Sequence, residues 1–120
     1  MEKTTKPGKQ RKRVYDAPLH ELQGFMRATL SRQLRKELGR RSLGLRKGDM
    51  VKIIKGSHKK AEGKIIAVDR KRGRIFVDSV KRKKVSGKEI SIPIRAGNAM
   101  LIELEKGDER RLHAKKKEKK

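Results

Sequence analysis

The stretch that decides the fold runs from Lys47 to Val68 and reads KGDMVKIIKGSHKKAEGKIIAV. Two short apolar segments, residues 50–54 and 64–68, flank a polar loop that is rich in lysine. Gly56 and Gly63 bracket that loop, and glycine allows positive φ angles and close backbone approach. Backbone N–H groups and ammonium groups can therefore face a phosphate chain together. The stretch predicts a strand–loop–strand unit whose loop binds a polyanion.

Composition points to the same partner. The 120 residues include 37 Lys and Arg against 14 Asp and Glu, so the formal net charge is +23. The excess is spread along the chain, with +10 in residues 1–47, +9 in 48–104 and +4 in 105–120. A chain with this self-repulsion is typical of a nucleic-acid binder, and the even spread favours burial in a large RNA over one docking face.

Other partners fit less well. An acidic membrane surface is the competing polyanion, but no apolar run approaches the roughly 20 residues that span a bilayer, and no signal-peptide core is evident. The chain has no cysteine, which excludes disulfides and cysteine-ligated zinc. The aromatic residues are Tyr15, Phe25 and Phe76 alone, so we expect recognition of phosphate and shape in place of base stacking.

The sequence predicts a series of short strands from residue 50 onward. Apolar alternation predicts strands at 50–54, 63–69, 74–79, 89–92 and 99–104, separated by turns that contain glycine. Five short strands in about 57 residues indicate a mainly β fold, a small barrel that would remove exposed edges. We therefore expect a barrel over residues 48–104, a basic N-terminal arm with short helices over 1–47, and a charged C-terminal tail over 105–120.

The N-terminal region is expected to be partly ordered. Residues 1–13 lack apolar periodicity and should be disordered until they meet a partner. Residues 16–26 and 31–38 predict two short helices, the first capped by Asp16 or Ala17 and the second by Ser31. The leucines of the second helix should pack on the following domain.

The expected RNA-binding residues are basic residues of the N-terminal region and of the turns and loops, together with the glycines and the serine of the lysine-rich loop. They are Lys9, Arg11, Lys12, Arg13, Arg32, Arg35, Arg41, Lys47, Lys55, Gly56, Ser57, His58, Lys59, Lys60, Gly63, Lys64, Arg70, Lys71, Arg72, Lys81, Arg82, Lys83 and Lys84.

Catalytic chemistry finds no support in the sequence. The histidines His20, His58 and His113 stand in separate segments, and no pair has metal-ligand spacing. Asp49, Asp69 and Asp78 lie at strand ends or turns, where aspartate commonly makes local hydrogen bonds. We therefore expect no enzyme activity, no metal, no cofactor and no small-molecule substrate.

The strand–loop–strand stretch resembles the KOW motif, found in ribosomal proteins and transcription elongation factors, at Gly48-Asp49, Val51, Gly56, Lys59, Gly63, Ile65 and Val68. The flanks resemble the archaeal and eukaryotic branch of the ribosomal protein L twenty-four (uL24) family of the large subunit. That resemblance covers residues 11–104 and rests on Ala17-Pro18-Leu19-His20, Arg41-Ser42-Leu43, Arg74-Ile75-Phe76-Val77 and Asn98-Ala99-Met100-Leu101-Ile102.

The resemblance implies a five-stranded SH3-like barrel in the cytoplasmic large ribosomal subunit. It also implies contact with the 5′ region of large-subunit rRNA early in assembly, with neighbouring ribosomal proteins, and with nascent-chain factors near the polypeptide exit tunnel. Two alternatives stay open. A transcription elongation module that docks on RNA polymerase would share Gly48 to Val68, and a basic chromatin-type protein would share the charge.

Overall fold

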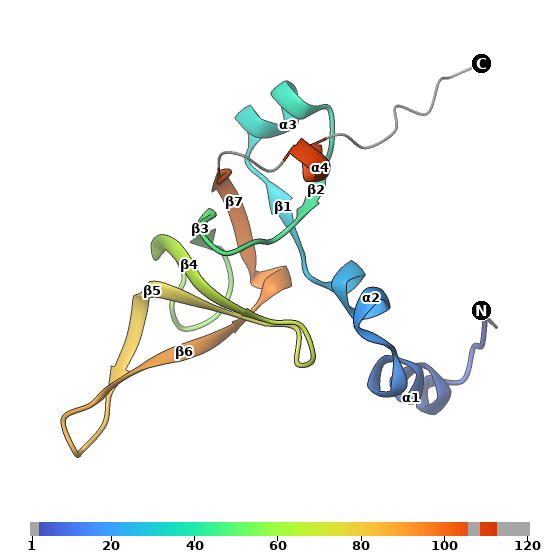
Figure 1. Cartoon of the computed structure of the whole chain (residues 1–120), viewed down its shortest axis with the longest axis horizontal. Coiled ribbons are helices and arrows are strands. Elements are labelled where there is room, and N and C mark those ends of the chain that lie inside the picture. Colours follow the sequence, from blue (N-terminus) through green and yellow to red (C-terminus); the bar gives the residue numbers. More distant parts are fainter. Residues whose placement is uncertain (1–2, 106–108, 113–120) are drawn as a thin grey trace.

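The computed structural model describes residues 3–105 and 109–112 and is mainly β (Figure 1). Seven strands form one sheet in the order β2-β1-β7-β3-β4-β5-β6. The strands are β1 (Arg27–Leu30), β2 (Ser42–Gly44), β3 (Met50–Ile53), β4 (Glu62–Asp69), β5 (Arg74–Lys83), β6 (Glu89–Arg95) and β7 (Ala99–Glu103). Neighbours are antiparallel except for β1 and β7, which run parallel.

All five strands expected after residue 48 are present as β3 to β7, with shifted ends. The sheet also contains two strands that the sequence did not predict, β1 and β2, which pair with each other and attach to β7 through β1. The order of the strands leaves β2 and β6 as edges. The mainly β class is confirmed, and the closed five-stranded barrel stays a prediction.

Strand β4 makes the sheet change direction. Its first half pairs with β3 and its second half with β5, and the register shifts between Ile65 and Ala67. A second shift, between Phe76 and Lys81, divides the β5–β6 hairpin into an inner and an outer part. Such irregularities bend strands and increase their twist, and in Figure 1 the hairpin extends away from the rest of the sheet.

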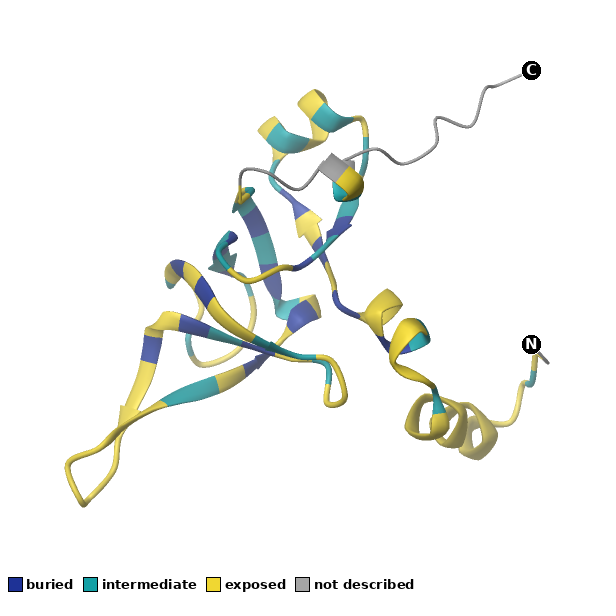
Figure 2. Cartoon of the chain, in the orientation of Figure 1, coloured by how far each residue is buried: buried dark blue, intermediate teal, exposed yellow. Residues whose placement is uncertain are grey.

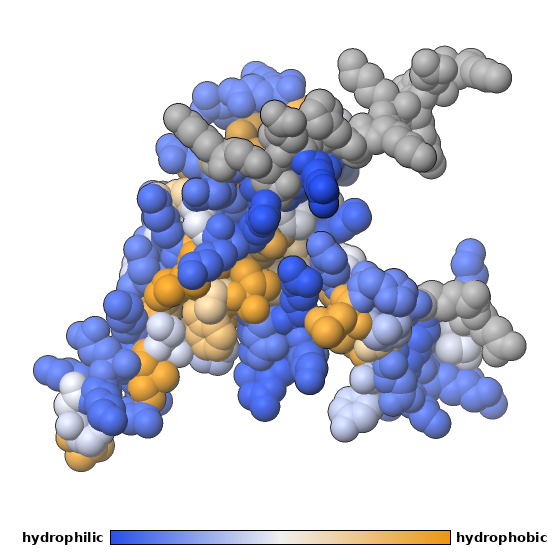
Figure 3. All heavy atoms as spheres, in the orientation of Figure 1, coloured by the Kyte–Doolittle hydropathy of each residue, from blue (hydrophilic) through white to orange (hydrophobic). Residues whose placement is uncertain are grey.

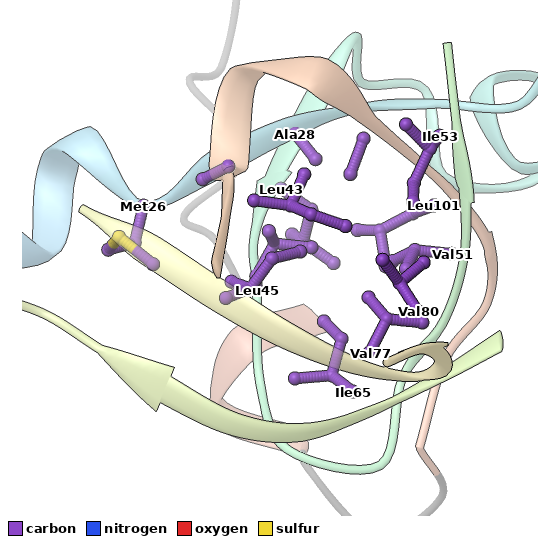
Figure 4. Close-up of a cluster of buried hydrophobic side chains, with 14 of the residues drawn as sticks. Met26, Ala28, Leu43, Leu45, Val51, Ile53, Ile65, Val77, Val80 and Leu101 are labelled. Carbon is purple, nitrogen blue, oxygen red and sulfur yellow. The ribbon is translucent and has the colours of Figure 1, made fainter. Parts of the chain in front are cut away.

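One hydrophobic cluster lies inside the bend, and residues from both the N-terminal region and the later strands form it (Figure 4). Val51, Ile53, Ile75 and Val77 are fully or almost fully buried, as alternate positions of β3 and β5. Leu30 of β1 is fully buried as well. The N-terminal region therefore forms part of the core itself. From the sequence we expected its leucines only to pack onto the domain that follows.

Helices occupy most of the N-terminal region. Helix α1 (Pro7–Asp16) is followed by α2 (Leu19–Leu22), the 3-10 turn η1 (Gln23–Phe25) and α3 (Arg32–Leu38). Helix α3 confirms the second expected helix, since the Ser31 hydroxyl accepts from Leu34 N at 3.4 Å and Gly39 ends the helix at a φ of 66°. Later, η2 (Ala96–Asn98) precedes β7, and α4 (Glu109–Leu112) follows it.

Two expectations for this region were wrong. Residues 7–13, expected to be disordered, belong to α1, because Pro7 suits the first helical turn and the following Lys, Gln and Arg are good helix formers. No residue of α1 is buried, so hydrophobic periodicity could not reveal it. The single helix expected over 16–26 is divided, with Asp16 ending α1 and Pro18 capping α2. Of the expected C-terminal tail, residues 106–108 and 113–120 lie outside the described residues.

Candidate nucleic-acid interface

The loop between β3 and β4 is held in a defined shape by its own backbone. Ile53 and Ala61 close it through a hydrogen bond from Ile53 N to Ala61 O at 2.8 Å, and Lys60 N donates to Ile53 O at 2.8 Å. Within the loop, Lys59 N donates to Gly56 O at 3.2 Å. Gly56 has a φ of 100° and Lys60 a φ of 74°. Hydrogen bonds within the chain therefore hold the loop backbone in a defined shape, from which the lysine side chains extend into solvent.

Most of the residues expected to bind RNA in this loop are exposed. Lys55, Gly56, Ser57, Lys59, Lys60 and Lys64 are exposed and His58 is half-buried. Gly63 differs, because it is buried in β4. A Cβ atom there would lie under 3.0 Å from side-chain atoms of Val77, Asp78 and Ser79. This glycine allows the close packing of β4 on β5, and its role in RNA binding stays a prediction.

A second basic turn joins β4 to β5. Arg70, Lys71 and Arg72 are all exposed there. Asp69 Oδ1 accepts from Arg72 N at 3.3 Å, and Gly73 completes the turn at a φ of 66°. The aspartate therefore serves as a local turn residue, as its sequence position predicted.

The outer part of the β5–β6 hairpin is the most exposed segment of the sheet. Residues 81–90 are all exposed, including Lys81, Arg82, Lys83 and Lys84 (Figure 2). Hydrogen bonds from Lys84 N to Lys88 O and from Gly87 N to Lys84 O, at 2.8 and 2.9 Å, close its tip. The cations of this projection lie on the β5 side and at the tip, because the outer part of β6 begins with Glu89 and carries none.

The remaining expected residues lie on the N-terminal region. Lys9, Arg11, Lys12 and Arg13 are exposed on α1, Arg32 and Arg35 are exposed on α3, and Arg41 and Lys47 are exposed in the connections around β2. Hydrophilic residues cover much of the face shown in Figure 3, from the hairpin to α1. The structure therefore does not gather the predicted residues into one pocket. Their spread over several edges suits an extended ligand.

Sequence reasoning missed a basic cleft beside β2. A cavity of about 660 Å³ there is lined by His20, Arg27, Arg40, Arg41 and Arg111, among others. Of these residues, only Arg41 was predicted. The others escaped notice because β1 and β2 were not predicted, and these strands bring residues 27 and 40–44 together.

A buried ion pair borders this cleft. Asp49 is fully buried and accepts from both terminal guanidinium nitrogens of Arg111, with 3.0 Å between Nη2 and Oδ1. The carboxylate also accepts from Arg46 N and Glu105 N, each at 2.9 Å. Arg111 in turn donates to Gly44 O at 3.1 Å. Asp49 thus fastens the segment after β7 to the start of β3, a role that the sequence did not reveal.

Among the residues that the structure describes, no three His, Cys, Asp or Glu side chains come together as a metal site. No helix within the described ranges is long and apolar enough to cross a membrane.

Comparison of the sequence with known proteins identifies one matching family. The model of the family described as the ribosomal proteins L26 of eukaryotes and L24 of archaea matches residues 4–117. The large ribosomal subunit protein uL24 of Methanosarcina barkeri is 49% identical over 111 residues, which cover 92% of this chain and 96% of the relative. Those of Korarchaeum cryptofilum and Sulfolobus acidocaldarius are 42% and 39% identical, over 91% and 92% of this chain and 83% of each relative.

Proposed function

The chain belongs to the family of eukaryotic L26 and archaeal L24 ribosomal proteins, and we propose that it is a structural, non-enzymatic constituent of the large ribosomal subunit in the cytoplasm. It binds rRNA through backbone phosphates. The observation that carries the proposal is the exposure of all the predicted lysines and arginines, on helices, loops and strands alike, in a chain with a net charge of +23. The mechanism is electrostatic, because bound Lys and Arg release counterions from the RNA.

The finer assignments belong to the same proposal. The RNA-binding residues are those predicted from the sequence, among which Gly63 also allows the close packing of β4 on β5. The strands β3 to β7 act as an SH3-like KOW unit over residues 48–104, flanked by the N-terminal region 1–47 and the tail 105–120. The partners are the 5′ region of large-subunit rRNA during early assembly, adjoining ribosomal proteins, and nascent-chain factors at the tunnel exit.

The transcription alternative is less favoured. A module that docks on RNA polymerase needs only the β3–β4 unit, whereas the family match extends over residues 4–117 and includes the N-terminal helices. The three relatives described above align with more than nine-tenths of the chain, and all three are large-subunit proteins.

Sedimentation of the tagged chain from native extract is the first test. We expect it to migrate with the large ribosomal subunit at moderate and at high salt. Migration with RNA polymerase, or loss from ribosomes at moderate salt, would contradict the proposal.

Binding to a transcript of the organism's large-subunit rRNA tests the mechanism. If about ten phosphates are contacted, log K should fall with log salt at a slope of roughly −7 to −9. Lys59→Glu combined with Lys60→Glu should weaken binding while cooperative melting persists, because both side chains are exposed. A slope near zero would contradict binding through phosphates. Unchanged affinity of the double variant would show that this loop is not part of the interface.

A further inference from the structure

We infer that the groove between the N-terminal helices and the β4–β5 turn binds one unpaired base of the RNA, stacked on Phe25. The inference rests on the proposed function and adds a mode of contact that the composition argued against. The sequence analysis expected phosphate and shape recognition alone, because aromatic residues are scarce. The structure places one of those aromatic rings where a base can reach it.

The groove has an apolar side built from the N-terminal helices. Its volume is about 460 Å³, within the range of about 300–1,000 Å³ usual for small-ligand sites. Val14 of α1, Leu22 of α2 and Phe25 of η1 line it. Leu22 is buried, whereas Phe25 keeps 57% of its surface exposed. An aromatic ring left more than half exposed at a groove offers a surface on which a planar group can stack.

The opposite side of the groove is cationic. Arg70 and Arg72 of the β4–β5 turn line it together with Arg95 at the end of β6. Ala96 N donates to Gly73 O at 3.4 Å, which ties this turn to η2. In Figure 1 the turn points toward α2, and in Figure 3 hydrophobic atoms over the α2 region lie beside hydrophilic ones. No acidic residue lines the groove among the residues described.

This combination fits a nucleotide in particular. A base presents a π-face to an aromatic ring, while its phosphate carries the negative charge that arginines bind. Arginine also stacks its planar guanidinium on bases. Asn98 lies at the end of the groove, and a side-chain amide can both donate to and accept from a base edge. An apolar segment of a neighbouring protein would cover Phe25 but would leave three arginines without anionic partners.

The decisive variant is Phe25→Ala, measured against a transcript of the organism's large-subunit rRNA. Loss of one stacked base should weaken binding roughly 5- to 150-fold. Tyr15→Ala is the matched control, because Tyr15 is 89% exposed on α1 and does not line the groove. We expect the control to bind like the wild type. Thermal melting of both variants establishes that the fold is retained.

Salt dependence separates stacking from phosphate contact. Phe25→Ala should lower the affinity by the same factor at every salt concentration and leave the slope of log K against log salt unchanged. Arg72→Gln should instead reduce the magnitude of that slope by roughly 0.7–0.9, as expected for one lost phosphate contact. A changed slope for Phe25→Ala would indicate an indirect loss of phosphate contacts and overturn the inference.

A fluorescence reporter gives a direct reading, because the chain contains no tryptophan. Phe25→Trp should bind the transcript as tightly as the wild type, and stacking on a base should quench its indole emission. Tyr15→Trp should show little quenching. Wild-type affinity of Phe25→Ala, or equal quenching at both positions, would assign the groove to another occupant such as a neighbouring protein. Failure of the wild-type chain itself to bind the transcript would instead count against the proposed function.

Discussion

The β1–β2 end of the sheet and the outer β5–β6 hairpin are built in opposite ways. At the first, Leu30 and Leu43 enter the core, and the buried Asp49–Arg111 pair fastens the chain after β7. At the second, every residue from 81 to 90 is exposed, and Val85 at the tip is fully exposed. Neither the cluster nor an ion pair described in the structure supports this projection.

Because the two regions differ in this way, RNA affinity and stability can be changed separately. Substitutions in the packed end remove contacts within the chain, so they should reduce the free energy of unfolding. Substitutions in the hairpin remove only groups that face outward, so they should change RNA affinity at nearly constant stability. Four variants test this contrast, and they follow in decreasing order of the change that we expect.

Asp49→Ala should produce the largest effect. The change leaves Arg111 without its buried carboxylate and two backbone N–H groups without their acceptor. Breaking a buried, hydrogen-bonded ion pair costs about 3–5 kcal/mol. Urea denaturation should report a loss of this size. Arg111→Ala should cost less, because Asp49 keeps both backbone donors. Asp78→Ala, at an exposed carboxylate that accepts from one backbone N–H, serves as the control. Equal stability of all three variants would show that the pair does not hold the packed end.

Gly63→Ala should come second. The added Cβ would press on Val77, Asp78 and Ser79 in a buried position, and overpacking of this kind costs about 1–3 kcal/mol. Gly97→Ala is the matched control, since no atom lies within 4 Å of its added Cβ and its φ is not positive. Thermal melting should separate the two variants. Wild-type stability of Gly63→Ala would leave the glycine free to serve the RNA surface after all.

Lys83→Gln combined with Lys84→Gln tests the other region. The exposed hairpin tip predicts a stability change within about 0.5 kcal/mol. Loss of two phosphate contacts should weaken rRNA binding roughly 10-fold at moderate salt and reduce the salt slope by about 1.4–1.8. Paired melting and binding curves provide the check. Reduced stability with unchanged affinity would reverse the contrast between the two regions.

The sequence predicted the later strands better than the earlier ones, for a physical reason. Alternating apolar residues in β3 to β7 report directly on a buried face, and the glycine-containing turns between them mark their ends. Strand β1 has four residues, of which only Ala28 and Leu30 are buried. The leucines that follow it have the spacing of a helix, which hides the strand pattern. Helix α1 has no buried residue at all. Short or wholly exposed elements carry too little periodicity to be recognised.

The candidate site was predictable in its charges and not in its geometry. Exposed lysines and arginines at turns follow from composition and spacing, which is why nearly all of them lie on the surface. The cleft beside β2 and the Phe25 groove are each formed by residues that lie far apart in the sequence. No local sequence pattern indicates such contacts. Gly63 shows a further limit of sequence reasoning, since a glycine needed for close packing looks the same in sequence as one that approaches a ligand.

Lys60→Gly should have the smallest effect. It tests stability and RNA binding at the same residue. Lys60 holds a φ of 74°, a left-handed conformation that costs a residue with a Cβ about 1–2 kcal/mol and costs glycine almost nothing. Because glycine also gains entropy in the unfolded chain, the net stabilisation should be at most about 1 kcal/mol. Lys59→Gly, in the same loop, lacks a positive φ to relieve and should be destabilising.

If Lys60 carries a phosphate contact, Lys60→Gly should melt at a higher temperature and bind rRNA more weakly, with a salt slope reduced by roughly 0.7–0.9. Strain retained at a binding residue is a known pattern of functional sites. The β3–β4 loop would then share a feature with each region. Its backbone is held in place by contacts within the chain, as at the packed end, and its side chains bind RNA, as those of the hairpin do. Higher stability with unchanged affinity would instead mean that the strained lysine makes no contribution to RNA binding.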